Sequence, residues 1–132
     1  MYRVVFDTNA FISAFAYGGT PEDAYRLAIR RKVILLTSPA IMQETARILK
    51  DKFNWEDERI EQALVQIARV SDIVRPKKRI KLLDDEPDNR ILECALEGKA
   101  DFIISGDKHL LTLKQFQDIP VVKAVDLVSK LT

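Results

Sequence analysis

Four acidic residues stand at positions where their side chains could hold a metal ion. Asp7 directly follows one short apolar run, and Asp107 follows another after a Ser-Gly pair. Glu44 and Asp88 lie far from both in sequence, each at a place where a helix would direct it toward the ends of those runs. A carboxylate next to a buried strand is costly to keep charged without a partner. The chemistry that this pattern indicates is the binding of a cation.

The apolar runs predict short strands, because β-branched residues dominate them and polar residues bound them. The predicted strands are residues 4–6, 33–36, 72–74, 102–104 and 121–122. Helical periodicity predicts helices at residues 21–31, 39 to about 52, 55–70, 88 to about 98 and 124–131. Strands that alternate with helices indicate an α/β fold whose central parallel sheet, here of about five strands, is covered on both faces. Ligands of such sheets bind outside the carboxyl ends of the strands.

Turn and capping residues mark where these helices begin and end. Thr20 is a predicted cap with Pro21 at the first helical position, and Ser38-Pro39 repeats that signal before the next helix. Gly98 is a predicted helix stop.

Three of the acids have an ordinary structural alternative. Asp7, Asp88 and Asp107 each precede a segment that could be a helix with the aspartate as its N-cap. For Asp107 this segment is a short helical turn before Thr112. Taken singly, each therefore fits a helix cap as well as a ligand. Their conjunction is harder to explain in that way, because the predicted topology brings them to one edge of the sheet.

Glu44 is the acid that looks least ordinary by itself. It recurs with Ile41 and Ile48 at positions i, i+3 and i+7, which predicts that it faces the sheet. The alternative is exposure at the rim, since Thr45 and Leu49 could equally define the centre of the buried stripe.

Composition and charge narrow the class of protein. The chain has 132 residues, 47% of them hydrophobic and 31% charged, which suits one soluble domain. Cys94 is the only cysteine and lies in an apolar helical pattern, so we expect a buried, inert thiol and a reducing compartment. We predict a cytoplasmic protein without a membrane span or signal peptide.

The net charge of +1 creates no global field that attracts nucleic acid. Basic residues nevertheless cluster at residues 30–32, at Lys50 and Lys52, and through residues 75–81, and an acidic cluster follows at residues 84–88. Each basic cluster is either a solvated turn or part of the border of an anionic substrate.

The kind of cation follows from the ligands available. Carboxylate oxygens suit Mg²⁺ or Mn²⁺, and the chain has no Cys/His cluster that would indicate zinc. One or two such ions would relieve the repulsion among clustered carboxylates and activate water for attack on a phosphodiester. The sequence has no Gly-rich phosphate-binding loop, so nucleotide hydrolysis of the P-loop type is unsupported.

Four segments, in the same order, resemble the PIN domain, and most closely its branch of toxin components from toxin–antitoxin pairs. The segments are residues 4–9 (VVFDTN), 38–44 (SPAIMQE), 87–95 (PDNRILECA) and 100–111 (ADFIISGDKHLL). The resemblance covers nearly the whole chain. It implies that residues 1–132 form a single nuclease domain with a three-layer α/β/α fold and a central parallel sheet.

The resemblance also implies an activity and a site. Family members are metal-dependent ribonucleases, and their acidic quartet, which holds Mg²⁺ or Mn²⁺, matches Asp7, Glu44, Asp88 and Asp107. Polar residues that support the site match Thr8, Asn9 and Ser105. Many relatives form homodimers, and toxin members are inhibited by an antitoxin protein that inserts into the site.

One position departs from the family pattern. This branch often has an acid two residues after the position of Asp107, where this chain has His109. His109 is either a ligand for phosphate or metal or a surface histidine beside Leu110 and Leu111. The substitution weakens the expectation of a second metal site more than that of the first.

We therefore predict a metal-dependent endoribonuclease that hydrolyses RNA, with the toxin of a toxin–antitoxin pair as one role. The alternative is a non-catalytic PIN-fold module that binds RNA or a protein partner. A phosphorylated receiver or an aspartyl-phosphate phosphatase fits poorly, because Asn9 stands where the phosphatase would have a second aspartate and no acid pair of receiver type follows the first strand.

Overall fold

Six strands form one sheet in the computed structural model, which describes residues 1–132. In chain order they are β1 (Arg3–Phe6), β2 (Ile34–Thr37), β3 (Ser71–Ile73), β4 (Phe102–Ile104), β5 (Gln115–Phe116) and β6 (Ile119–Val122). Their spatial order is β3-β2-β1-β4-β6-β5, and every neighbouring pair is parallel except β5 and β6. The predicted α/β fold with a mostly parallel sheet is confirmed, with β3 one residue earlier than expected.

The additional strand β5 was absent from the prediction, and its local sequence explains why. It has only two residues and turns back into β6 through Gln117 and Asp118, whose φ angles are 47° and 67°. A tight hairpin that needs two positive φ angles is normally signalled by Asn-Gly or Asp-Gly. Gln-Asp gives no such signal, so the hairpin could not be recognised from the sequence.

The centre of the sheet is apolar and completely buried. Val4, Val5 and Phe6 of β1, like Ile103 and Ile104 of β4, have no exposed surface. Strands buried on both faces need helices above and below them. This is why the acids at the strand ends lie on a rigid support rather than on mobile loops.

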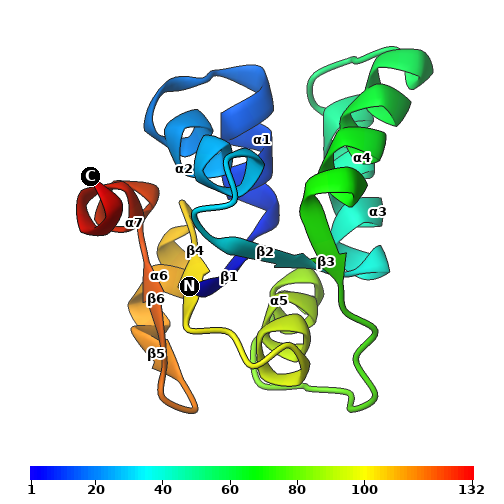
Figure 1. The fold of residues 1–132 in the computed structure, drawn as a ribbon. Helices are drawn as coiled ribbons and strands as arrows, with labels where there is room; N and C mark the ends of the chain where they lie inside the picture. The colour runs from blue at the N-terminus through cyan, green and yellow to red at the C-terminus, as the bar shows by residue number, and fades with distance from the viewer.

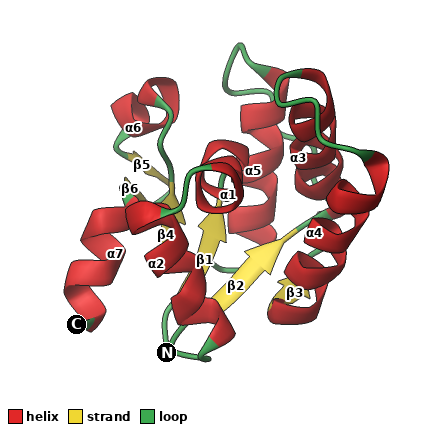
Figure 2. Ribbon diagram, turned by 90° about the horizontal axis from the view of Figure 1, so that it is seen from above, coloured by secondary structure: helices red, strands yellow, loops and turns green.

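Seven helices cover the sheet. They are α1 (Thr8–Ala16), α2 (Gly19–Ile29), α3 (Pro39–Asp51), α4 (Asp57–Val70), α5 (Glu86–Glu97), α6 (Lys108–Leu113) and α7 (Ala124–Leu131). Helices α1 and α2 lie on one face of the sheet and α5 on the opposite face (Figure 1). These two faces and the sheet between them make the three layers expected from the resemblance. Figure 2 shows β3 beside α4 at one edge of the sheet and β5 and β6 near α6 at the other. None of these helices has the length and apolarity that spanning a membrane requires.

The starts of two helices, α1 and α2, differ from the prediction. Helix α1 was not predicted as an element and begins directly after Asp7. Helix α2 begins at Gly19, not at residue 21, and Thr20 is not its cap. The reason is the turn between the two helices, where Gly18 and Gly19 take φ angles of 79° and 68° that glycine adopts without strain.

Two further helix starts bear on the acids. In α3 the predicted cap is confirmed, because the N–H of Ile41 donates to Oγ of Ser38 at 3.3 Å. Helix α5 begins at Glu86 with Asp85 as the N-cap residue, so Asp88 lies inside the first turn and the capping alternative for Asp88 is wrong. Helix α4 begins two residues later than predicted.

The segment between β3 and α5 has no regular secondary structure, yet a buried amide holds it in place. Asn89 of α5 is 0% exposed. Its Oδ1 accepts hydrogen bonds from the N–H groups of Leu82 (3.2 Å) and Leu83 (2.8 Å), and its Nδ2 donates to the carbonyl oxygen of Leu83 (2.8 Å) and to Glu86 (3.1 Å). One side chain thus fixes the approach of the chain to the start of α5.

A buried ion pair holds the same segment one turn further along α5. Glu93, 6% exposed, accepts a hydrogen bond from the N–H of Ile80 at 2.8 Å and pairs with Arg90 at 2.9 Å. Arg90 in turn donates to the carbonyl oxygen of Ile80 at 3.0 Å. The positions of these three α5 side chains determine the course of a loop that ends three residues before Asp88.

Replacing Asn89 by alanine is predicted to destabilise the protein by about 2 kcal/mol, because main-chain groups of Leu82 and Leu83 lose their partners. The measurement is the free energy of unfolding from urea titration. Gln66→Ala is the matched control, an exposed amide on α4 that is expected to change stability by less than about 0.5 kcal/mol. Equal effects of the two substitutions would contradict this role of Asn89.

Candidate active site

Asp7 is held at the carboxyl end of β1 by contacts on both sides. Its backbone N–H donates to the carbonyl oxygen of Ile104 in β4 at 2.9 Å. Its Oδ1 accepts a hydrogen bond from the N–H of Ala10 at 2.7 Å, and its Oδ2 accepts one from Oγ of Ser105 at 2.5 Å. The side chain is 2% exposed. Asp7 therefore caps α1 and is also a buried acid, so the two interpretations of this residue are compatible.

Ser105 connects Asp7 to Asp107. The backbone N–H of Ser105 donates to the carbonyl oxygen of Val122 in β6 at 2.9 Å, which fixes Ser105 at the end of β4. Its hydroxyl donates to Asp7 and also accepts a hydrogen bond from the N–H of Asp107 at 2.9 Å. Asp107 is the N-cap of α6, and its Oδ1 accepts a hydrogen bond from the N–H of His109 at 3.0 Å.

Asp88 comes to the same edge from the other layer. It is buried in the first turn of α5, where it does not cap the helix. The pKa of its carboxyl is raised to about 6, mainly by burial and also by the negative charges of Asp85 and Asp107, whereas His109 lowers it. The carboxylates of Asp88 and Asp107 are therefore close enough to repel each other.

The pKa of Asp7 is also displaced strongly upward. This pKa is raised from 3.8 to about 7, mainly by burial and also by the charges of Asp107 and Asp88, against the hydrogen bonds from Ser105 and Ala10, which lower it. The three aspartates thus act on one another electrostatically and form one acidic centre, defined here as Asp7, Asp88 and Asp107. Acids whose pKa values rise to 6–7 by burial and mutual repulsion are typical of functional sites.

The donor chemistry of the acidic centre suits a hard divalent cation, since all of its ligands are carboxylate oxygens and a positive ion would offset their repulsion. No three acidic, histidine or cysteine side chains are grouped closely enough to enclose an ion as they stand. The three carboxylates would need to turn toward one another to share a cation.

Glu44 lies near the acidic centre but does not join it. The buried stripe of α3 is centred on Ile41, Thr45 and Leu49, and Glu44 lies at its edge with 15% of its side chain exposed. The prediction that Glu44 points fully inward is therefore wrong, and the rim position is correct. Its carboxylate pairs with the guanidinium of Arg47, at 2.6 Å from Nε.

A small hollow separates Glu44 from the start of α5. It is lined by Thr8 and by residues of α3 and α5, including Glu44, Glu86, Pro87 and Arg90. Thr8, which directly follows Asp7 in the chain, therefore borders the same hollow as Glu44. Asn9, by contrast, is exposed on α1. Of the three predicted supporting residues, Ser105 is the one whose side chain contacts an acid.

His109 is an exposed residue of α6, and its side chain lies close enough to Asp88 to favour the charged carboxylate. Four residues around the acids were not singled out from the sequence: Arg47, Asn89, Arg90 and Glu93. Asn89 and Glu93 gave a signal that could have been used. Two polar residues four apart, flanking the apolar positions Ile91 and Leu92, indicate a buried polar stripe.

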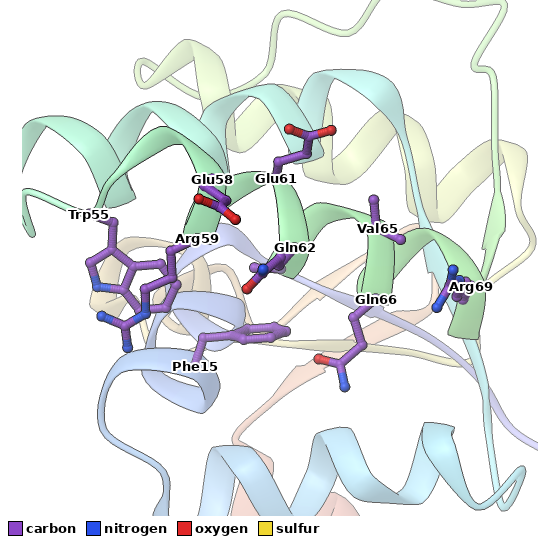
Figure 3. Close-up of a pocket in the computed structure, with 10 residues that line it drawn as sticks. Phe15, Trp55, Glu58, Arg59, Glu61, Gln62, Val65, Gln66 and Arg69 are labelled. Atoms are coloured by element: carbon purple, nitrogen blue, oxygen red, sulfur yellow. The ribbon is translucent and has the colours of Figure 1, made fainter.

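The largest groove of the chain lies away from the acids, between α1 and α4. Figure 3 shows Phe15 reaching toward this groove from α1 and Trp55 with Arg59 at one end of it. The guanidinium of Arg59 lies 3.6 Å from the centre of the Trp55 ring, as in a cation–π contact. Since none of the four acids lines this groove, we do not assign the chemistry to it.

Comparison with known proteins agrees with the geometry. The family model described as "PIN domain" matches residues 3–109. The chain is 36% identical over 117 residues to an uncharacterized protein of Methanocaldococcus jannaschii, MJ1680, covering 85% of this chain and 75% of that protein.

Solved structures share the fold at low sequence identity. PAE2754 from Pyrobaculum aerophilum has a TM-score of 0.65 and 11% identity, covering 98% of this chain and 89% of that one. VapBC2 from Rickettsia felis, solved bound to a DNA fragment from its promoter, has a TM-score of 0.62 and 13% identity, and the match covers 90% of this chain and 96% of that one. VapBC-1 from nontypeable Haemophilus influenzae has a TM-score of 0.62 and 15% identity, and the match covers 93% of this chain and 98% of that one.

The raised pKa of Asp7 predicts a pH-dependent stability in the metal-free protein. Because folding raises this pKa, the group favours the folded state below about pH 4 and loses that contribution as the pH rises through about 7. Asp7→Asn keeps an acceptor for Ala10 and removes the buried charge. We expect it to stabilise the protein at pH 8 by about 2–4 kcal/mol, and not at pH 4.

The measurement is urea unfolding at both pH values in the presence of a chelator. Asp23→Asn, an exposed aspartate on α2, is the matched control and should change stability little at either pH. A destabilising effect of Asp7→Asn at pH 8 would show that the buried carboxylate is not under electrostatic strain.

Proposed function

The chain belongs to the PIN domain family, whose members are generally nucleases, and from this premise we propose that it is a metal-dependent endoribonuclease that hydrolyses RNA phosphodiester bonds. The observation that carries the proposal is the acidic centre at one edge of the sheet, where the charge of Asp107 helps to raise the pKa values of the buried Asp7 and Asp88. The whole chain, residues 1–132, acts as a single nuclease domain in this proposal.

In the proposed site the three aspartates share one role, and Glu44 and the polar residues have others. Asp7, Asp88 and Asp107 hold Mg²⁺ or Mn²⁺, which when bound neutralises charge on the phosphodiester and lowers the pKa of water. The hydroxyl of Ser105 orients the carboxylate of Asp7 through its 2.5 Å hydrogen bond. Glu44, across the hollow, accepts a hydrogen bond from the attacking water after exchanging its contact with Arg47. Thr8 and Asn9 border the place where the phosphate lies.

The alternative proposal is a non-catalytic module that binds RNA or a protein partner through the same fold. The α1–α4 groove, with Phe15 and the stacked Trp55 and Arg59, favours a protein partner for such a module. Partner binding that survives loss of all three aspartates, with no RNA cleavage by the native protein, separates this alternative from the nuclease.

We further propose a toxin role in a toxin–antitoxin pair and a homodimer. Support comes from the sequence resemblance to the toxin branch and from the likeness in fold to the two VapBC structures. Light scattering on the purified chain tests the dimer, and co-purification with the product of a neighbouring gene tests the antitoxin. The cytoplasmic location stays a prediction.

The nuclease proposal predicts that Asp7→Asn and Asp107→Asn each reduce Mn²⁺-dependent RNA cleavage by roughly 100-fold or more. Loss of a direct ligand should exceed the 10–100-fold effect that is typical of supporting groups. The measurement is the rate of cleavage of a labelled single-stranded RNA, with and without chelator.

Asp101→Asn is the matched control for Asp107→Asn. Asp101 directly precedes β4, and its Oδ2 accepts a hydrogen bond from the N–H of Arg3 at the amino end of the strands. Asn can keep this bond, so cleavage should stay within about twofold of the native rate. If Asp107→Asn is as active as this control, the acidic centre is not the catalytic site.

The position of Glu44 predicts a milder effect than that of the aspartates. Because Glu44 lies at the rim and is paired with Arg47, we expect Glu44→Gln to lower the cleavage rate by about 10-fold with an almost unchanged Mn²⁺ requirement. Titration of activity against Mn²⁺ distinguishes the two kinds of variant. A Mn²⁺ requirement raised as strongly as in Asp88→Asn would place Glu44 among the direct ligands instead.

A further inference from the structure

A strongly basic segment lies between β3 and α5 without carboxylates to neutralise most of it. The basic segment, defined as residues 75–83, carries five cations, all of them exposed: Arg75, Lys77, Lys78, Arg79 and Lys81. Arg79 lies 4.0 Å from Glu86, and the other four form no ion pair. Five like charges in nine residues repel one another, so a loop of this kind would spread into solvent unless other contacts held it.

The contacts that hold the basic segment involve its main chain and leave its cations free. The N–H of Lys77 donates to Glu97 at 3.1 Å, and the N–H of Ile80 donates to Glu93 at 2.8 Å. Further along, Asn89 binds the main chain of Leu82 and Leu83. Glu93 and Glu97 of α5 are therefore engaged by backbone donors of the segment, and the lysine ammonium groups remain available for a ligand.

These bonds also fix the direction of the basic segment. Its first anchored residue meets the last turn of α5, at Glu97, and its last meets the first turn, at Asn89, so it runs antiparallel to the helix. Asp88 of the acidic centre is the neighbour of Asn89. With a rise of 1.5 Å per residue, the nine steps along the helix from Asp88 to Glu97 span about 13 Å. The cations thus line a path that leads away from the acidic centre over the length of a few nucleotides.

A shallow hollow lies at the end of this path that is farther from the acidic centre. It lies between the basic segment, the last turns of α5 and Gln117 at the tip of the β5–β6 hairpin, with Lys77, Lys78 and Arg79 on its wall. A polyanion seated there would meet three positive side chains, and the two carboxylates that also line the hollow, Glu93 and Glu97, already accept hydrogen bonds from main-chain N–H groups. Contacts of this kind bind phosphates and carry no sequence information.

We propose that the basic segment binds the backbone phosphates of the RNA substrate, on the strand that leads away from the scissile bond. The inference rests on the proposed ribonuclease function and adds where the substrate lies. It makes Asn89 and Glu93 positioning residues, which hold the cations in line with the acidic centre. The binding energy is electrostatic, so it falls with salt concentration and is similar for different RNA sequences.

The test compares two triple variants that each remove three charges. Lys77→Gln/Lys78→Gln/Arg79→Gln changes the basic segment. Arg30→Gln/Arg31→Gln/Lys32→Gln changes an exposed cluster between α2 and β2, and α2 lies on the face of the sheet opposite α5 and the basic segment. Both are made in the Asp7→Asn background, so that RNA is bound without being cut. Fluorescence anisotropy with a labelled single-stranded RNA gives Kd at several salt concentrations.

We expect the segment variant to weaken binding by about 10- to 100-fold at 0.1 M salt. The slope of log Kd against log salt should fall by about 2, since each phosphate contact of a single strand contributes about 0.7. The control variant should keep both values near those of the background protein. Circular dichroism and urea unfolding of both variants establish that they fold equally well.

Three results would overturn the inference. Unchanged affinity and slope in the segment variant would remove the basic segment from the RNA path, and weakened binding to polyglutamate in the same variant would then assign it to an acidic protein partner. An equal loss in the control variant would show a general charge effect. Cleavage by the native protein is measured alongside, so if it cuts RNA in any of these cases the proposed function stands while the inference fails.

Discussion

A carboxylate buried where two parallel strands end is the constraint on which the rest of this structure depends. Asp7 is 2% exposed, and its pKa of about 7 reflects burial that the hydrogen bonds from Ser105 and Ala10 only partly offset. A buried carboxyl group is stable in only a few states: protonated, paired with a base, or bound to a cation. The neighbouring charges of Asp88 and Asp107 add repulsion, and a bound cation, as in the proposed site, would offset the charge of all three.

The fold supplies the rigidity that this arrangement needs. Strands β1 and β4 are adjacent and buried except for their first residues, so the residues that follow them are placed side by side with little freedom. Ser105 joins the two strand ends by accepting from Asp107 and donating to Asp7. Helix α5 brings Asp88 from the opposite face and uses its other polar residues, Asn89 and Glu93, to hold a loop of cations beside the same centre. One helix therefore contributes to both the acidic and the basic parts of the proposed site.

Much of this arrangement could be predicted from the sequence, because strands 4–6 and 102–104 are apolar runs and parallel sheets bind ligands at their carboxyl ends. What could not be predicted depends on contacts between distant residues. Glu44 fits the apolar stripe of α3 by spacing, but the exact centre of a stripe is decided by packing, which selected Thr45. The start of α5 at Glu86 moved Asp88 from a cap to a buried first-turn acid. The hydrogen bonds of Asn89 join residues whose pairing no local pattern encodes.

The central claim is that the carboxylates of Asp7, Asp88 and Asp107 share one divalent cation, and that Asp7 and Asp88 give up protons to bind it. Isothermal titration calorimetry of the native protein with Mn²⁺ at pH 8 and at pH 5.5 tests it most directly. The account predicts binding at pH 8, and binding at pH 5.5 that is at least about 10-fold weaker with release of protons, since the pKa values of Asp7 and Asp88 are about 7 and 6. Equal affinity at the two pH values, or no binding at pH 8, would contradict it.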